Sequence, residues 1–74
     1  MMQTIGDRIR AKRKELGISQ EELADRVFVS VYTLRSYEIH DNMPHVDTAF
    51  RLAKELGVTV EWLVEGDKNG TETH

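Results

Sequence analysis

The chain has 74 residues, of which 31% are charged, carries a formal net charge of −3 and contains no cysteine. A chain of this length forms one domain at most. The lack of thiols excludes disulfides and thiolate metal sites, and no apolar run approaches the roughly 18 residues that a membrane span needs. No signal-peptide pattern precedes the first expected helix. We therefore expect a soluble, cytoplasmic protein without a cofactor.

The charge is distributed unevenly along the chain. Residues 1–38 carry a net charge of +1, whereas residues 39–74 carry a net charge of −4. An acidic total is not the composition first expected of a protein that binds nucleic acid. Such binding is still possible, because affinity depends on the local field at the phosphates and not on the total charge.

The first predicted helix runs from about Thr4 to Leu16, and Ile5, Ile9 and Leu16 are spaced to share one face. Basic side chains interrupt this apolar stripe in its middle turn. A charge run of this kind is usually a solvated helix surface and not a footprint for nucleic acid. We expect this of the five basic residues that cover most of the remaining surface: Arg8, Arg10, Lys12, Arg13 and Lys14.

Two short helices are predicted next, at about 20–27 and 31–39. Ser19 and Ser30 are preferred N-cap residues, and Glu22 completes a capping box with Ser19. A connection of three or four residues gives the pair the geometry of a helix-turn-helix. In that geometry the following apolar side chains point inward together: Leu23, Ala24, Val27, Val29, Leu34 and Tyr37.

The same geometry leaves one face of the second of these helices exposed. That face enters the major groove when such a unit binds DNA. Its side chains are Val31, Tyr32, Thr33, Arg35 and Ser36.

The polar segment 40–45 contains Pro44 and is predicted to be a loop. Its His40, His45 and Asp41 raise the possibility of a metal site. Their spacing matches no common site and no fourth ligand is evident, so we interpret them as surface residues and expect no metal.

A fourth helix is predicted from Val46 or Asp47 to Leu56, and a fifth begins after the N-cap Thr59 and ends at Gly66. The expected inward face of the fourth comprises Phe50, Leu52, Ala53 and Leu56. In the fifth we expect Trp62 and Leu63 in the core and Val60 and Val64 at a two-fold dimer interface. The domain would span residues 1–66, and residues 67–74 would be a disordered tail.

Several short motifs together resemble the lambda-repressor-like helix-turn-helix family of the Cro/CI or Xre type. The similarity covers residues 5–66, and each motif is modest alone but specific in combination. It implies an all-α, compact five-helix domain that usually dimerises and binds operator DNA as a transcriptional regulator. The motifs are Arg13, Gly17, the SQEELA run at 19–24, the Val-Ser pair at 29–30, the Tyr-Glu pair at 37–38, Pro44 and the LGVTVEWL segment at 56–63.

The resemblance also implies roles for particular residues. Arg13 and Glu38 would form a structural ion pair between the first and third helices. The base-reading candidates are Val31, Tyr32 and Ser36, and the phosphate-contacting candidates are Gln20, Thr33 and Arg35.

The chain departs from the family pattern at the expected DNA surface. Phe28 occupies a turn position where the family usually has Gly, and a left-handed backbone there costs roughly 1–2 kcal/mol. We therefore expect the turn to be rebuilt, with Phe28 either exposed or packed over the helix pair. Asp41 stands in a loop that is usually basic, where it would repel phosphates. Val31 and Tyr32 replace residues that make bidentate base contacts.

Two functions remain in competition at the level of sequence. The favoured one is a sequence-specific DNA-binding regulator, most simply a repressor, that binds a palindromic operator as a homodimer. The alternative is a protein-interaction module of the same fold, such as an antirepressor-like or toxin–antitoxin partner, which would use Phe28, Val31 and Tyr32. An enzyme is not expected, because the sequence contains no nucleophile–base pairing, paired carboxylates or glycine-rich phosphate loop.

Overall fold

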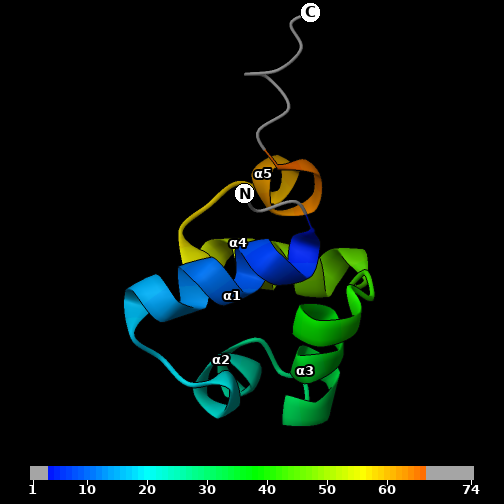
Figure 1. Cartoon of the computed structure of the whole chain (residues 1–74). Coiled ribbons are helices and arrows are strands. Elements are labelled where there is room, and N and C mark those ends of the chain that lie inside the picture. The colour runs from blue at the N-terminus through cyan, green and yellow to red at the C-terminus, as the bar shows by residue number, and fades with distance from the viewer. Residues whose placement is uncertain (1–3, 67–74) are drawn as a thin grey trace, which may run out of the picture.

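The computed structural model describes residues 4–66, which fold into five α-helices without strands in that range (Figure 1). The all-α fold predicted from the sequence is confirmed. The tail expected at 67–74 lies outside the described residues, so the domain boundary at residue 66 stays a prediction. The helices are α1 (Ile5–Leu16), α2 (Gln20–Arg26), α3 (Val31–His40), α4 (Val46–Leu56) and α5 (Val60–Glu65).

Side-chain caps define where four of the five helices begin. Thr4, Ser19, Ser30 and Thr59 each accept a hydrogen bond from the backbone N–H three residues later, which satisfies one of the open donors at a helix start. His45 begins α4 without a side-chain cap. The predicted helix boundaries therefore agree with the structure to within about one residue, the usual uncertainty of a helix end.

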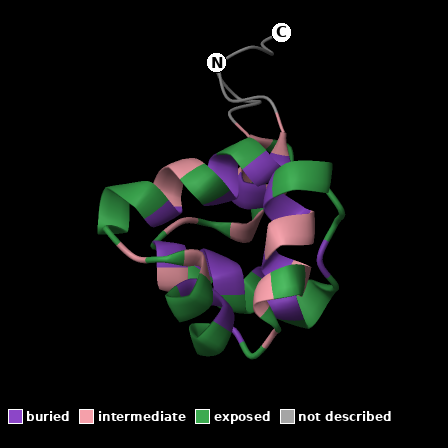
Figure 2. Cartoon of the chain, turned by 60° about the horizontal axis from the view of Figure 1, so that its bottom comes forward, coloured by how far each residue is buried: buried purple, intermediate pink, exposed green. Residues whose placement is uncertain are grey.

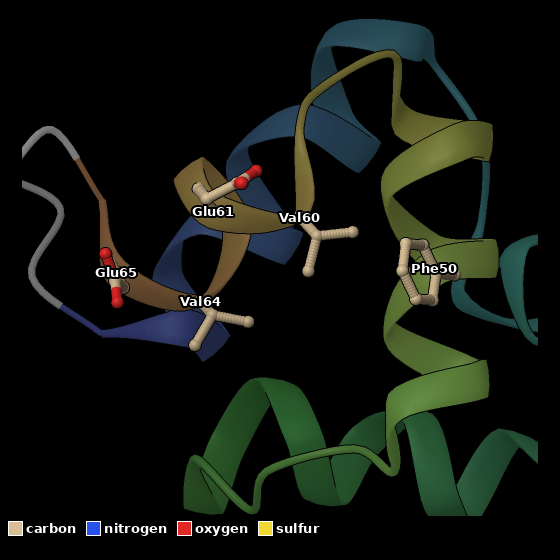
Figure 3. Close-up of a pocket in the computed structure, with 5 residues that line it drawn as sticks. All are labelled: Phe50, Val60, Glu61, Val64 and Glu65. Atoms are coloured by element: carbon tan, nitrogen blue, oxygen red, sulfur yellow. The ribbon is translucent and has the colours of Figure 1, made fainter.

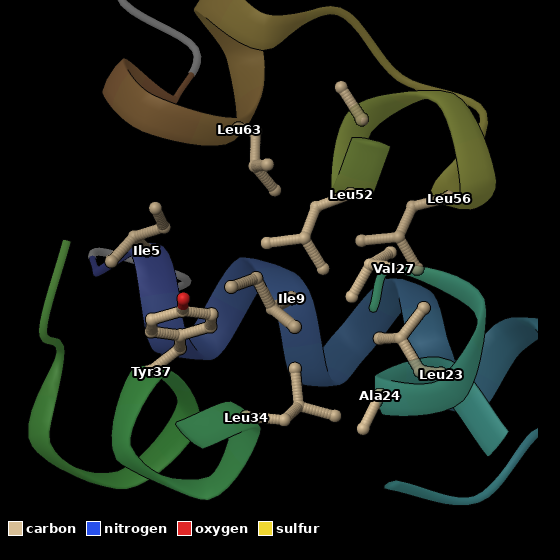
Figure 4. Close-up of a cluster of buried hydrophobic side chains, with 11 residues drawn as sticks. Ile5, Ile9, Leu23, Ala24, Val27, Leu34, Tyr37, Leu52, Leu56 and Leu63 are labelled. Atoms are coloured by element: carbon tan, nitrogen blue, oxygen red, sulfur yellow. The ribbon is translucent and has the colours of Figure 1, made fainter. Parts of the chain in front are cut away.

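Helix α1 crosses the middle of the molecule and contacts α3, α4 and α5, while α2 packs on α3 (Figure 1). The faces turned toward one another are buried and the outward faces are exposed (Figure 2). Ile9 lies at the centre of the core, between Leu34 of α3 and Leu52 of α4 (Figure 4). The core consists of Ile5, Ile9, Leu23, Ala24, Val27, Leu34, Tyr37, Leu52, Ala53, Leu56 and Leu63.

Two expectations about apolar faces are wrong. Phe50 is 61% exposed and Leu16 is 49% exposed. In α4 the buried stripe runs through Ala49, and Phe50 lies one position off it. In α1 the inward position of the last turn is taken by Arg13, which is buried, so that Leu16 is left at the surface.

Arg8 was expected on a solvated face, but it is 4% exposed. Its guanidinium reaches across to the end of α5, where Nε donates to the carbonyl oxygen of Leu63 and Nη2 to that of Val64, both at 2.8 Å. These carbonyls belong to the last turn of a helix, which leaves its acceptors unpaired and carries a partial negative charge. Arg8 therefore joins the first helix to the last.

Trp62 is half-buried and does not lie in the core as expected, whereas Leu63 is fully buried as predicted. The Nζ atom of Lys12 lies 5.4 Å from the centre of the Trp62 ring. This places a cation over the most favourable aromatic face. Lys12 and Trp62 thus contact each other at the surface where α1 meets α5.

Candidate nucleic-acid interface

The connection between α2 and α3 is a tight turn around Phe28. Phe28 adopts the left-handed conformation with a φ of 64°, and its side chain is 77% exposed. The next residue, Val29, returns to the helix pair by donating its N–H to the carbonyl of Ala24 at 3.0 Å. The expectation of a rebuilt turn is therefore wrong, because Phe28 itself adopts the left-handed conformation, whereas its expected exposure is found. The guanidinium carbon of Arg51 lies 5.2 Å from the ring centre and partly covers the ring.

Replacement of Phe28 by Gly is expected to stabilise the domain relative to Phe28→Ala. Both variants lose the ring and its contact with Arg51, but only Gly removes the steric cost of the left-handed backbone, roughly 1–2 kcal/mol. The greater freedom of Gly in the unfolded chain offsets part of this gain. Denaturant unfolding should show Phe28→Gly to be more stable than Phe28→Ala by up to about 1 kcal/mol. A more stable Ala variant would show that the turn stores no strain.

Helix α3 presents the expected outward face. Tyr32 is 75% exposed, and Arg35 and Ser36 follow it at three and four residues, on the same side of the helix. Val31 is half-buried and packs against the core. The structure therefore brings Tyr32, Arg35 and Ser36 together at the surface and turns Val31 partly away.

Glu38 and Arg13 form a buried ion pair between α3 and α1. Arg13 donates from Nε to Glu38 Oε2 at 2.8 Å and from Nη2 to Glu38 Oε1 at 3.2 Å. The side chain of Glu38 is 1% exposed and that of Arg13 is 11% exposed. Arg13 Nη1 also donates to the carbonyl of Ile18 at 3.0 Å. The pair thus fixes α1, the start of the helix-turn-helix and α3 relative to one another.

Gln20 extends this pair to the surface. Its Nε2 donates to Glu38 Oε1 at 3.0 Å, and its Oε1 accepts from Arg35 Nε at 3.1 Å. The side-chain amide that the sequence assigns to a phosphate is therefore engaged within the protein at both ends. Spacing along the chain gave no signal for this bridge, because Gln20 begins α2 whereas both of its partners lie on α3.

Two further hydrogen bonds organise the polar side chains of α3. Thr33 Oγ1 accepts from the hydroxyl of the N-cap Ser30 at 3.0 Å. Ser36 accepts a hydrogen bond from the side-chain amide of Asn42. Asn42, which the sequence analysis did not single out, therefore lies beside a candidate base-reading residue.

Asp41 has a partner within the protein that the sequence analysis did not identify. It ends α3 with a left-handed φ of 56°, and its Oδ1 accepts from the N–H of Gly6 at 3.0 Å. The carboxylate is thus placed at the start of α1, where the helix dipole favours a negative charge. Asp41 thus connects α3 to α1 but remains exposed, and its repulsion of phosphates stays a prediction.

The close approach of α1 and α3 at this point depends on Gly6. A Cβ atom on Gly6 would lie 2.5 Å from the carbonyl oxygen of Glu38 and 2.6 Å from that of Tyr37. Both neighbours are backbone atoms. Burial of the Tyr37 ring in this region also raises the pKa of its hydroxyl above the ordinary value of 10.0.

A second surface feature lies away from the turn, between α4 and α5. It is an open groove of about 460 Å³, in which Phe50 stands across from Val60 and Val64, with Glu61 and Glu65 completing its lining (Figure 3). Val60 and Val64 are half-buried and pack partly on the core. The groove is thus apolar between the valines and Phe50 and acidic along α5.

Neither a membrane span nor a metal cluster is found among the described residues. No helix in the range 4–66 is long and apolar enough to cross a membrane. The same range holds no group of three or more His, Asp or Glu side chains placed to bind a metal.

A tight turn between two helices, with a polar and aromatic face exposed on the second, defines the class of helix-turn-helix proteins. The chain belongs to the helix-turn-helix family, whose model matches residues 9–63, and to its lambda-repressor-like Cro/CI type. The family is one of DNA-binding regulators.

The relatives support the same assignment. The repressor protein C2 of Salmonella phage P22 is 35% identical over 93% of this chain and 32% of its own length. The transcriptional regulator DicA of Escherichia coli K12 is 34% identical over 95% of this chain and 52% of its own length. The crystal structure of the P22 c2 repressor in complex with a synthetic operator superposes with a TM-score of 0.84, at 35% identity, over 88% of this chain and 98% of that one. The chain thus spans about a third to a half of these two curated relatives.

Proposed function

We propose that the chain is a sequence-specific DNA-binding transcriptional regulator, most simply a repressor, that acts in the cytoplasm as a homodimer. The observation that carries the proposal is the exposed face of α3, held by a buried network within a helix-turn-helix. The solved P22 c2 structure, in which a repressor of the same fold is in complex with operator DNA, supports it. This is a binding function, which requires neither catalysis nor a cofactor.

In the proposed complex α3 enters the major groove. Tyr32 and Ser36 would contact base edges, Tyr32 through its exposed hydroxyl and ring and Ser36 together with Asn42. Val31 would meet a thymine methyl with the part of its side chain that is exposed. Thr33 would contact the sugar–phosphate backbone beside the N-cap, as would the N-terminus of α2 at Gln20.

We propose the groove between α4 and α5 as the dimer interface. Val60 and Val64 were the sequence-based candidates, and Phe50 adds an exposed ring directly opposite them. A two-fold axis at this surface would pair the same patch with itself. Two copies of α3 would then lie in successive major grooves, about 34 Å apart.

Selection of binding sites from a random duplex pool tests this function. At low salt the bound fraction should be enriched in one palindromic sequence, and affinity should fall with salt on a log–log slope of about −0.9 for each phosphate contacted. Tyr32→Ala should change the selected bases, whereas Leu16→Ala, which removes an exposed side chain at the end of α1, should not. Failure to bind any duplex at low salt would contradict the proposal.

The protein-interaction alternative is favoured by one observation. Phe28 and Tyr32 are both more than 70% exposed, and exposed aromatic side chains are common in protein contact sites. The salt titration separates the two functions, because a contact made by these rings responds weakly to salt.

A further inference from the structure

Arg35 is held in one orientation on the surface of α3. Its Nε donates to Gln20 Oε1 at 3.1 Å. Its guanidinium carbon lies 5.7 Å from the centre of the Tyr32 ring, and its Nη2 lies 3.9 Å from Glu21 Oε2. The side chain nevertheless remains 42% exposed. An arginine with this exposure ordinarily samples many rotamers, and fixing one costs conformational entropy.

The support for Arg35 comes from the interior. Gln20, which accepts from Arg35, donates to Glu38 at 3.0 Å. Glu38 in turn is held by two hydrogen bonds from Arg13 and is 1% exposed. The orientation of Arg35 is thus coupled through one glutamine to the most buried ion pair of the domain.

We propose that Arg35 reads a guanine in the major groove and that Gln20 is the residue that positions it. The inference rests on the proposed DNA-binding function, and it moves Arg35 from the phosphate contacts to the base contacts. Nε is engaged by Gln20, and Nη2 lies at the limit of an ion pair with Glu21, 3.9 Å away, so that Nη1 and Nη2 are the donors left for a base. Two donors in one plane match the O6 and N7 acceptors of guanine.

The position of Arg35 on α3 agrees with this role. It stacks on Tyr32, three residues earlier, and is followed by the half-buried Ser36, so that it lies between two of the base-reading candidates. A phosphate contact needs a positive charge but not this fixed plane. Gln20 consequently acts through Arg35, and its side chain itself needs no contact with DNA.

Substitution of Arg35 by Lys in this chain tests the assignment, because Lys keeps the charge but lacks the planar fork. The operator selected by the wild-type chain should contain a guanine in each half-site that the wild type prefers over other bases by about 5- to 150-fold. We expect Arg35→Lys to lose most of this preference while it retains the preferences at other positions. Replacing that guanine by 7-deazaguanine, which lacks N7, should weaken the wild type and leave Arg35→Lys unaffected.

Gln20→Ala tests the positioning role. It should reduce the guanine preference in the wild-type background but not in the Arg35→Lys background, a non-additivity that general destabilisation does not produce. Arg26→Lys is the matched control: the side chain of Arg26 is 43% exposed and pairs with Glu22 of α2 and Glu55 of α4. It should leave every base preference unchanged.

The outcomes separate this inference from the function on which it rests. If Arg35→Lys and Arg35→Ala keep the guanine preference, and Arg35→Ala weakens all sequences alike with a salt slope smaller by about one, Arg35 is a phosphate contact and the inference is overturned alone. If the wild-type chain selects no duplex, the DNA-binding function is overturned and the role of Arg35 with it.

Discussion

Glu38→Ala is expected to lower the free energy of unfolding by about 3–5 kcal/mol, because it leaves Arg13 as a buried charge without its partner. The substitution removes the acceptor of three hydrogen bonds, two from Arg13 and one from Gln20. A loss of this size is a large part of the stability of a domain, which is commonly about 5–15 kcal/mol. The expected result is a domain that is largely unfolded near 37 °C, as seen by circular dichroism and urea unfolding.

Glu22→Ala is the matched control for this prediction. Glu22 also pairs with an arginine at 2.8 Å, but the side chains of Glu22 and Arg26 are 48% and 43% exposed. An exposed pair of this kind contributes roughly 0.3–0.5 kcal/mol. If the two substitutions cost the same, burial does not determine the importance of the Arg13–Glu38 pair.

Removal of both charges distinguishes the electrostatic effect of the Arg13–Glu38 pair from the effect of the volume that its side chains fill. Arg13→Met combined with Glu38→Leu should be far less damaging than Glu38→Ala, since a buried ion pair can be replaced by apolar side chains of similar volume at little cost. Gln20 would then lose its acceptor on Glu38. We therefore expect this double variant to fold but to hold Arg35 less firmly.

Gly6→Ala is expected to destabilise the domain by up to about 3 kcal/mol, the cost of forcing an extra carbon into a packed contact. The new Cβ would lie 2.5 Å and 2.6 Å from two backbone oxygens of α3, neither of which can move without moving the helix. It would also crowd the carboxylate of Asp41, which accepts from the Gly6 N–H. Thermal unfolding should show the loss as a lower Tm.

Helix propensity alone predicts the opposite sign, because Ala is favoured over Gly in a helix by about 1 kcal/mol. An increase in stability on Gly6→Ala would therefore show that α1 and α3 do not approach closely. Gly17→Ala provides a comparison. A Cβ atom at this position would meet nothing within 4 Å, but the backbone of Gly17 has a φ of +71°. It should cost about 1–2 kcal/mol from backbone strain alone.

Local chemistry made much of this fold predictable. Ser19, Ser30 and Thr59 are good N-caps, and Gly17 and Gly57 end helices in the left-handed conformation, so that helix boundaries followed from short-range signals. The register of α4 was less certain, because Phe50 and Ala49 are neighbours and both are apolar. Only packing against the rest of the core shows that the small residue faces inward.

The long-range contacts, within the domain and around the candidate site, were harder to predict. Arg8 looked like one member of a solvated basic face, yet its partners lie 55 and 56 residues away. The hydrogen bond that Asp41 accepts was likewise missed, because its donor, the N–H of Gly6, lies 35 residues away. The residues next to an arginine or aspartate in the sequence do not show whether it has a distant partner. Sequence periodicity therefore predicts that such a residue faces solvent.

The contact between Arg8 and α5 also bears on the order in which the domain assembles. A helix of six residues is not stable alone in water, and the carbonyls of Leu63 and Val64 in the last turn of α5 accept hydrogen bonds from Arg8, a residue near the start of the chain. During synthesis the ribosome releases α1 long before α5. The side chain of Arg8 therefore stays exposed and charged until nearly the whole domain has emerged. Its burial against α5 is a late step in the formation of the fold.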